Sequence, residues 1–341
     1  MAQHKRQHYV PQSYLKRFTQ DDKRLYVYDK VLRQSLGLIS VKDIAQESYF
    51  YDIPLDAIPK DIPGINRDPH LEEEGLKAID DEFKKIIDVA IGVAKGGGAD
   101  LKQRAVMSFC LAVQLMRTLD FRNVLVRAME KLTEATLNSV LELADPKLAS
   151  QLRVEAKKYD KGGASVLHNH HLWNPENMSR IAKVLYNRIW LLGVNTSPIP
   201  LYTSDAPVAL WAHKEMEPYT PKPDTGPAFS KAIDMVIESD RPGLETEGVE
   251  VYFPLNPHCA LIILENEHFK NLQEWQGKRI PLNLAAVEAY NKLQVLESHR
   301  QVYSISDDFG LAEKTCAEHP EKCASDRERV KIEFWKWNTQ S

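Results

Sequence analysis

The run His8-Tyr9-Val10-Pro11-Gln12, followed by Leu15 and Phe18, is the part of the sequence that most constrains the fold. It lies near the N-terminus, where most chains fray and tolerate change. The run nevertheless combines histidine, aromatic, proline and glutamine residues without turn-like filler. We therefore expect this segment to be drawn into the body of the protein.

The bulk composition is that of a globular protein. The chain has 341 residues, of which 43% are hydrophobic and 27% charged, enough for one large domain or two ordinary ones. A net charge of -4 argues against a broad basic face. A nucleic-acid partner would need a local patch, and the one basic cluster, which includes His4, Lys5, Arg6, Lys16 and Arg17, is also typical of a solvated face.

The apolar segments are too short for a membrane protein. The longest, from Ala105 to Met116, is interrupted by Ser108 and Gln114, whereas a spanning helix needs about 20 apolar residues. No apolar region of a secretory signal follows the basic N-terminus, and four cysteines do not form a disulfide scaffold in a chain of this length. We expect no membrane partner and a cytoplasmic location.

Hydrophobic periodicity separates the chain into a helical part and a β-rich part. A strand is predicted at 24–29, and an amphipathic helix at 70–94, where a run of three glycines follows. Helices are expected at 101–129, 131–158 with a break near Asp145, 176–188, 266–276 and 282–299, and strands at 189–194, 201–210, 249–253, 259–264 and 301–304.

This order predicts an α+β fold rather than a βαβ repeat. We expect a helical layer, roughly 70–190, packed on a small, mostly antiparallel sheet formed by the N-terminal strand and the C-terminal half. A single domain would span 1–312, with a C-terminal extension at 313–341. In the extension, apolar and charged residues alternate over 330–334 before Trp335 and Trp337. This tail is either an edge strand on its own domain or an arm that forms a homo-oligomer.

Polar residues interrupt the apolar face of the predicted helix at 70–94. Glu73 and Asp80 lie on the same face as Leu76 and Phe83, because they are spaced three or four residues apart. Carboxylates buried there would need a cation, a metal ion or protons. Alternatively, Glu73 only favours the helix N-terminus and Asp80 lies at the edge of the stripe.

Gln114 and Arg117 interrupt the most apolar helix in the same way. A buried arginine must be paired, and a carboxylate on the preceding helix is the natural partner. The alternative is that Arg117 binds an anionic substrate through both ends of its guanidinium.

Three further groups resemble ligand sets. The segment Thr203-Ser204-Asp205-Ala206-Pro207 ends an apolar run, so Asp205 is either a turn residue or a catalytic or metal-binding carboxylate. The histidines 168, 170 and 171 are expected in a loop, where we interpret them as incidental surface residues. Cys316, His319 and Cys323 form only half of a zinc pattern.

From about His8 to Ser304 the sequence resembles domain-of-unknown-function family 4238, which is widespread in bacteria. The resemblance rests on the His8–Gln12 run and on later blocks, and Asp80 stands where the family pattern leads us to expect glutamate. It implies boundaries and candidate residues but no reaction. The later blocks are Glu73 to Asp80, Gln114 to Arg117, Trp190 to Pro207, Phe253-Pro254-Leu255 and Asn291 to Ser304.

The polar residues selected above fall in these blocks and would suit metal-assisted hydrolysis, with phosphodiesters, nucleic acid among them, as substrates. Glu73, Asp80 and Asp205 would hold Mg²⁺ or Mn²⁺, with His8 as general base or further ligand. Arg117 would stabilise the phosphate charge. The remaining predicted catalytic residues are Gln12, Gln114 and Ser204.

The rival hypothesis is a non-catalytic binding or regulatory protein. In it His8, Gln12, Gln114 and Arg117 form a buried network that fastens the N-terminus to the helices. The two hypotheses differ in one structural fact. In the hydrolase, Glu73, Asp80 and Asp205 converge on an open cleft, whereas in the binding protein Arg117 and His8 close the carboxylates off.

Overall fold

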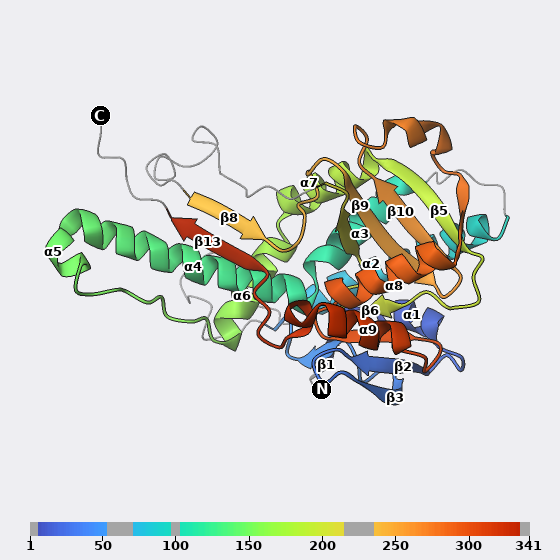
Figure 1. Cartoon of the computed structure of the whole chain (residues 1–341), viewed down its shortest axis with the longest axis horizontal. Helices are drawn as coiled ribbons and strands as arrows, with labels where there is room; N and C mark the ends of the chain where they lie inside the picture. The colour runs from blue at the N-terminus through green and yellow to red at the C-terminus, as the bar shows by residue number, and fades with distance from the viewer. Residues whose placement is uncertain (1–5, 53–70, 97–102, 215–234, 335–341) are drawn as a thin grey trace.

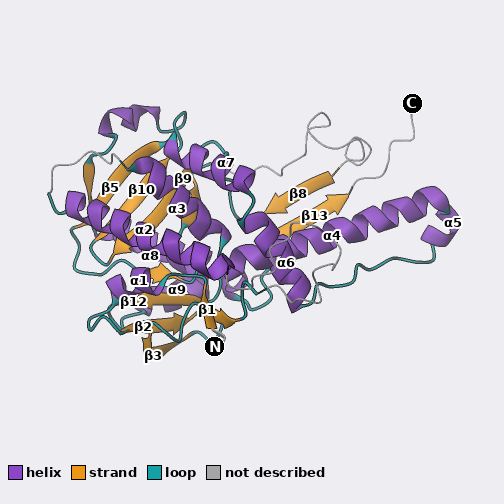
Figure 2. Ribbon diagram, turned by 180° about the vertical axis from the view of Figure 1, so that it is seen from behind, coloured by secondary structure: helices purple, strands orange, loops and turns teal. Residues whose placement is uncertain are grey.

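The computed structural model describes residues 6–52, 71–96, 103–214 and 235–334. It confirms the α+β class, with helices on several mostly antiparallel sheets (Figures 1 and 2). The β-rich part is more divided than the single sheet predicted, because it forms a five-stranded sheet, a four-stranded sheet and two-stranded ribbons.

The five-stranded sheet forms the centre of the hydrophobic core. Its strands lie in the order β11-β5-β10-β9-β7, and only β11 runs parallel to its neighbour. Trp190, Phe253 and Leu261 on its strands are fully buried, as expected of apolar runs covered on both faces. The bounds are β5 Ile189–Asn195, β7 Ala209–Ala212, β9 Val249–Asn256, β10 Cys259–Leu264 and β11 Arg279–Leu282.

The four-stranded sheet joins the two ends of the chain. Its order is β3-β2-β12-β6, so the N-terminal strand β2 lies beside β12 from the C-terminal part. This pairing bears out the prediction that the N-terminal strand shares a sheet with the C-terminal half. The bounds are β2 Arg24–Asp29, β3 Gln34–Ser40, β6 Thr203–Ser204 and β12 Gln301–Ser304.

Most helices pack around these sheets, whereas α4 extends from the body as a long arm with the short α5 at its far end (Figures 1 and 2). The ribbon of β8 and β13 lies beside this arm. The bounds are α2 Leu71–Ala94, α3 Arg104–Met116, α4 Leu119–Ala144, α5 Pro146–Ala149, α6 Lys161–Leu172, α7 Pro175–Tyr186, α8 Leu284–Glu297, α9 Gly310–Glu318, β8 Met235–Ser239 and β13 Val330–Phe334, with short 3₁₀ helices at Lys270–Trp275 and Pro320–Cys323.

The N-terminal run is drawn into the body, as predicted. Strand β1 (Arg6–His8) pairs with β4 (Gln46–Ser48), and α1 (Gln12–Leu15) and a 3₁₀ turn (Lys16–Phe18) follow. Val10, Leu15 and Phe18 are completely buried in the main core. The hydroxyl of Tyr14 bonds to Thr203 Oγ1 at 2.7 Å and donates to the Pro254 carbonyl at 2.8 Å, so this run is attached to the central sheet.

The helix predicted at 101–129 is wrong as one element. Helix α3 ends at Met116, and Thr118 begins α4 by accepting a hydrogen bond from the Phe121 amide on its hydroxyl at 3.2 Å. Such a side-chain cap stabilises a helix start by about 1 kcal/mol. The break leaves Arg117 in the short link between the two helices.

Other boundaries also differ from the expectation. The helix predicted at 131–158 breaks at Asp145, as expected, but only the short α5 lies beyond the break, and 266–276 holds a 3₁₀ helix instead of an α-helix. The predicted histidine loop is helix α6, capped by Asp160, and His168 is fully buried in it.

The tail and the membrane prediction have clear outcomes. The alternating residues 330–334 form strand β13, antiparallel to β8, whereas Trp335 and Trp337 lie outside the described residues. Oligomer formation through this tail stays a prediction. In the described ranges, no helix has the length and apolar character needed to cross a membrane.

Candidate functional site

The described structure places four of the predicted site residues around one pocket, which we call the N-terminal pocket. Its volume is 330 Å³, at the small end of the range for ligand sites. Its lining comes from β1, α1, α2 and the link after α3: Arg6, Gln7, His8, Pro11, Gln12, Ser13, Tyr51, Leu76, Lys77, Asp80, Asp81 and Arg117.

Arg117 is paired with Asp80, as the predicted partnership between α3 and α2 requires. Its Nη1 donates to Asp80 Oδ1 at 2.5 Å and its Nη2 to Asp80 Oδ2 at 3.4 Å. Only 3% of the Arg117 side chain is exposed, against 24% for Asp80. Burial acts to lower the pKa of Arg117, but the Asp80 carboxylate outweighs it and holds the pKa above its ordinary value.

The remaining donors of Arg117 fasten the N-terminal segment. Nη2 also donates to the His8 carbonyl at 2.9 Å, and Nε donates to the Tyr51 hydroxyl at 3.4 Å. The Tyr51 hydroxyl in turn donates to the Arg117 carbonyl at 3.3 Å. Four of the five N–H groups of the guanidinium are therefore bonded within the protein, and binding an anion through two N–H groups would require breaking one of these bonds.

His8 and Gln12 meet at the edge of the pocket. Gln12 Nε2 lies 3.4 Å from His8 Nδ1, a long contact that leaves the amide able to bond elsewhere. The other ring nitrogen, Nε2, is buried and has no hydrogen-bond partner in the part of the chain that the structure describes. Burial lowers the pKa of His8, although the backbone near Val41 and Lys42 opposes this, so the environment favours the neutral ring.

Gln114 lies deeper and acts on the same segment. Its Nε2 donates to the Tyr9 carbonyl at 3.1 Å, and only 1% of the residue is exposed. Gln114 and Arg117 thus bond two successive carbonyls of the N-terminal run. Gln114 is not among the residues that line the pocket.

Asp205 and Ser204 form a different site. Asp205 is 98% buried (2% exposed) and accepts three backbone hydrogen bonds, from the amides of His299, Arg300 and Gln301, each at 2.8 Å. Ser204 Oγ donates to Gln294 Oε1 at 2.8 Å. Burial raises the pKa of Asp205, while His299 and the backbone donors oppose that rise. Ser204 fastens β6 to α8, and Asp205 fastens the end of β6 to the residues between α8 and β12. Neither residue lines the N-terminal pocket.

The predicted metal ligands do not converge on one site among the described residues. Asp80 is neutralised by Arg117, and Asp205 is committed to three amides. Glu73 belongs to α2, but its side chain lies outside the described residues. Within the described ranges, no group of three or more His, Cys, Asp or Glu side chains is arranged to hold a metal ion. The carboxylates described here do not fit a divalent cation.

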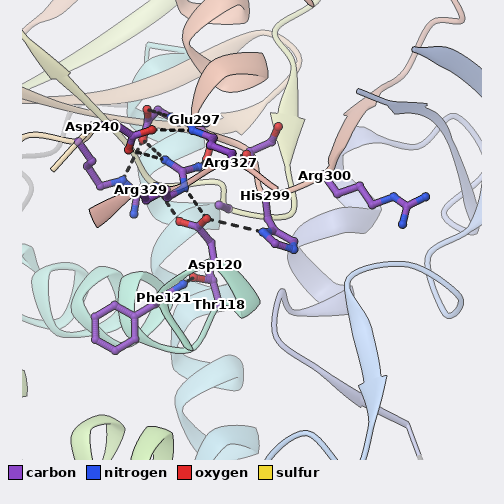
Figure 3. A network of polar contacts seen from close by, with 12 residues as sticks. Thr118, Asp120, Phe121, Asp240, Glu297, His299, Arg300, Arg327 and Arg329 are labelled. Atoms are coloured by element: carbon purple, nitrogen blue, oxygen red, sulfur yellow. Dashed lines mark hydrogen bonds and ion pairs between the residues drawn. The ribbon is translucent and has the colours of Figure 1, made fainter. Parts of the chain in front are cut away.

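Sequence reasoning missed a second polar cluster, which Figure 3 shows close by. Asp120 at the start of α4 pairs with Arg329 at 2.6 Å and with Arg241 at 3.2 Å. Glu297 pairs with Arg241 at 2.8 Å, and Arg327 pairs with Asp240 at 2.6 Å. Because these residues are up to 209 positions apart, as in the pair of Asp120 and Arg329, periodicity offers no signal for them. The alternation of arginines at 327 and 329 is the one local hint.

Comparisons with known proteins give the family. No curated protein and no solved structure gives a significant match to this chain. One family model matches residues 6–308, which is most of the chain and includes every residue predicted for the site. Its description is "Protein of unknown function (DUF4238)". Over these residues the chain belongs to the DUF4238 family of proteins of unknown function.

Proposed function

We propose that the protein is a non-catalytic binding protein and that the N-terminal pocket is its ligand site. The observation that carries this proposal is the bonding of Arg117, four of whose five N–H donors go to Asp80, His8 and Tyr51. In the hydrolase scheme this guanidinium would stabilise a phosphate. Here it joins α3, α2 and the N-terminal run.

The pocket keeps several groups that a ligand can use. In the described part of the chain, the side chains of Ser13, Lys77 and Asp81 make no hydrogen bond or ion pair. With the Gln12 amide they supply donors and acceptors of both charge signs around 330 Å³. This lining suits a small polar molecule that carries both donors and acceptors.

A binding screen tests the proposal. We would measure the thermal midpoint with millimolar amino acids, mononucleotides and monosaccharides, for wild type and for Gln12→Ala. A ligand at a hundred times its dissociation constant adds about 2.7 kcal/mol to the free energy of unfolding. A midpoint shift in wild type that Gln12→Ala removes is expected. Ser139→Ala, on the α4 arm away from the pocket, is the control and should show the same midpoint shift as wild type.

The second candidate is the hydrolase acting on phosphodiesters, with nucleic acid as a substrate. The neutral imidazole of His8, held near Gln12 beside Asp80, favours it, since a neutral histidine in a pocket accepts protons. The test is cleavage of single- and double-stranded DNA and RNA with and without Mn²⁺ or Mg²⁺. If nucleic acid is cleaved, and His8→Asn abolishes the cleavage without unfolding the protein, the hydrolase hypothesis replaces that of a non-catalytic binding protein.

A further inference from the structure

The second polar cluster borders a pocket of its own, which we call the arginine pocket. Its volume is 140 Å³, well above the roughly 10–15 Å³ that one water needs. We propose that the arginine pocket binds a small oxyanion of the phosphate class. The lining residues are Val31, Asp120, Asn123, Val124, Arg127, His299, Arg300, Ala324, Ser325, Arg327, Arg329 and Val330.

The lining is strongly cationic. Four arginines, at 127, 300, 327 and 329, face one carboxylate, that of Asp120. Arg241, Arg327 and Arg329 form ion pairs with Asp240 and Glu297, which lie just outside the lining. Arg300 forms an ion pair with Asp29 at 2.7 Å. Arg127 donates to the Arg327 carbonyl at 2.8 Å but has no acidic partner within the described ranges. One arginine charge, that of the exposed Arg127 at the mouth of the pocket, is therefore left without an acidic partner among the described residues.

Lys30 indicates the same excess of positive charge. Its side chain is fully buried, and its ammonium donates to the carbonyls of Val295 and Ser298 at 3.2 and 2.5 Å, without a carboxylate partner in the described structure. Burial, and then the charges of Arg327 and Arg329, lower the pKa of Lys30 to about 8. An anion in the adjacent pocket would relieve this repulsion between cations.

Neutral donors are available beside the arginines. The side chains of Asn123 and Ser325 line the pocket and make no hydrogen bond to any described residue. His299 also lines it, and its Nδ1 lies 3.8 Å from Asp120 Oδ1, too far for a hydrogen bond (Figure 3). Amide, hydroxyl and imidazole donors around guanidinium groups are the typical surroundings of a bound oxyanion.

The pocket lies where three distant segments meet. Asn123 and Arg127 come from α4, His299 and Arg300 from the link between α8 and β12, and Arg327 and Arg329 from the segment before β13. This last segment lies beyond residue 308, where the family match ends. An oxyanion bound here would contact both the family domain and the C-terminal extension.

The experiment is a titration of the full chain with inorganic phosphate by calorimetry, with chloride at matched ionic strength as reference. We expect one phosphate per chain and no corresponding heat from chloride. Asn123→Asp places a negative charge in the pocket and should weaken binding by roughly tenfold or more. Ser139→Asp adds the same charge about 24 Å farther along α4 and should bind as wild type does. Ser325→Asp repeats the pocket test from another segment.

The possible outcomes are distinct. The proposal is supported if phosphate binds and both Asn123→Asp and Ser325→Asp weaken its binding. If AMP binds more tightly than phosphate and the same two variants weaken its binding, the ligand is the phosphate group of a nucleotide. Equal binding of phosphate and AMP assigns the free ion. Binding that neither Asn123→Asp nor Ser325→Asp weakens, or a response that chloride reproduces, overturns it.

Discussion

Arg117 and Asp80 form a two-point ion pair between the link after α3 and the middle of α2, at 2.5 and 3.4 Å. The pair is asymmetric, because the guanidinium is almost wholly buried while the carboxylate keeps about a quarter of its side chain exposed to the pocket. The same guanidinium bonds the His8 carbonyl. The Arg117 guanidinium therefore holds together both the helical layer and the N-terminal run. Such bonding is expected of a structural network, whereas a catalytic arginine would keep its donors for the substrate.

The Tyr14 hydroxyl is the attachment of the N-terminal run to the sheet. Tyr14→Phe should lower the free energy of unfolding by about 1–2 kcal/mol, because the Pro254 carbonyl and Thr203 hydroxyl then lose a buried partner. Urea unfolding measures the change. Tyr26→Phe is the matched control, since its hydroxyl makes no hydrogen bond in the described structure, and its effect should stay within about 0.5 kcal/mol. Equal effects of the two variants would contradict the attachment.

His168 should make the fold sensitive to acid. It is fully buried, its Nε2 bonds the Met116 carbonyl at 2.7 Å, and burial lowers its pKa from 6.5 to about 4. Between these values the unfolded chain binds more protons than the folded one, so stability falls as the pH drops from about 6.5 to about 4. The total loss is about 3 kcal/mol.

The measurement is urea unfolding of wild type and His168→Asn across that pH range. The difference between the two proteins isolates the His168 contribution, because the other titrating groups are common to both. The gap in stability in favour of wild type should shrink as the pH falls from about 6.5 to about 4. A gap that does not change with pH would show that His168 does not titrate as its burial requires.

Asp205 is expected to be structural. Asp205→Ala leaves three buried amides without an acceptor and should cost at least about 3 kcal/mol. Asp205→Asn should cost less, because its amide oxygen still accepts. The exposed Asp326→Ala is the control for loss of a carboxylate. A variant at 205 that unfolds like wild type would return Asp205 to the list of candidate metal ligands.

Local patterns predicted much of the fold. The apolar stripe of α2, with Leu76 and Phe83 buried, and the strand at 24–29 follow from periodicity. The burial of Val10 and Phe18 followed from the composition of the N-terminal run. The partnership of Arg117 with a carboxylate on α2 followed from the cost of burying a lone charge.

What could not be predicted depends on contacts distant in sequence or on one side chain. Thr118 ends a continuous apolar pattern by capping α4, so the helix boundary rests on a single hydroxyl. The three donors to Asp205 lie 94 to 96 residues later in the chain. The partner of Asp120, Arg329, lies on a segment that only the tertiary fold brings near. Periodicity carries no information on any of these.

The measurement that tests the central claim most directly is urea unfolding of wild type and Asp80→Asn, each with and without millimolar Mn²⁺ or Mg²⁺. The structural account predicts that Asp80→Asn loses about 3 kcal/mol, because it leaves the buried Arg117 charge unpaired, and that neither ion stabilises either protein. The neighbouring Asp81→Asn, whose carboxylate is exposed and unpaired in the described structure, should behave like wild type. The account would be contradicted if a metal ion stabilised wild type but not Asp80→Asn, and if the variant without metal were as stable as wild type. That result would restore the metal-dependent hydrolase.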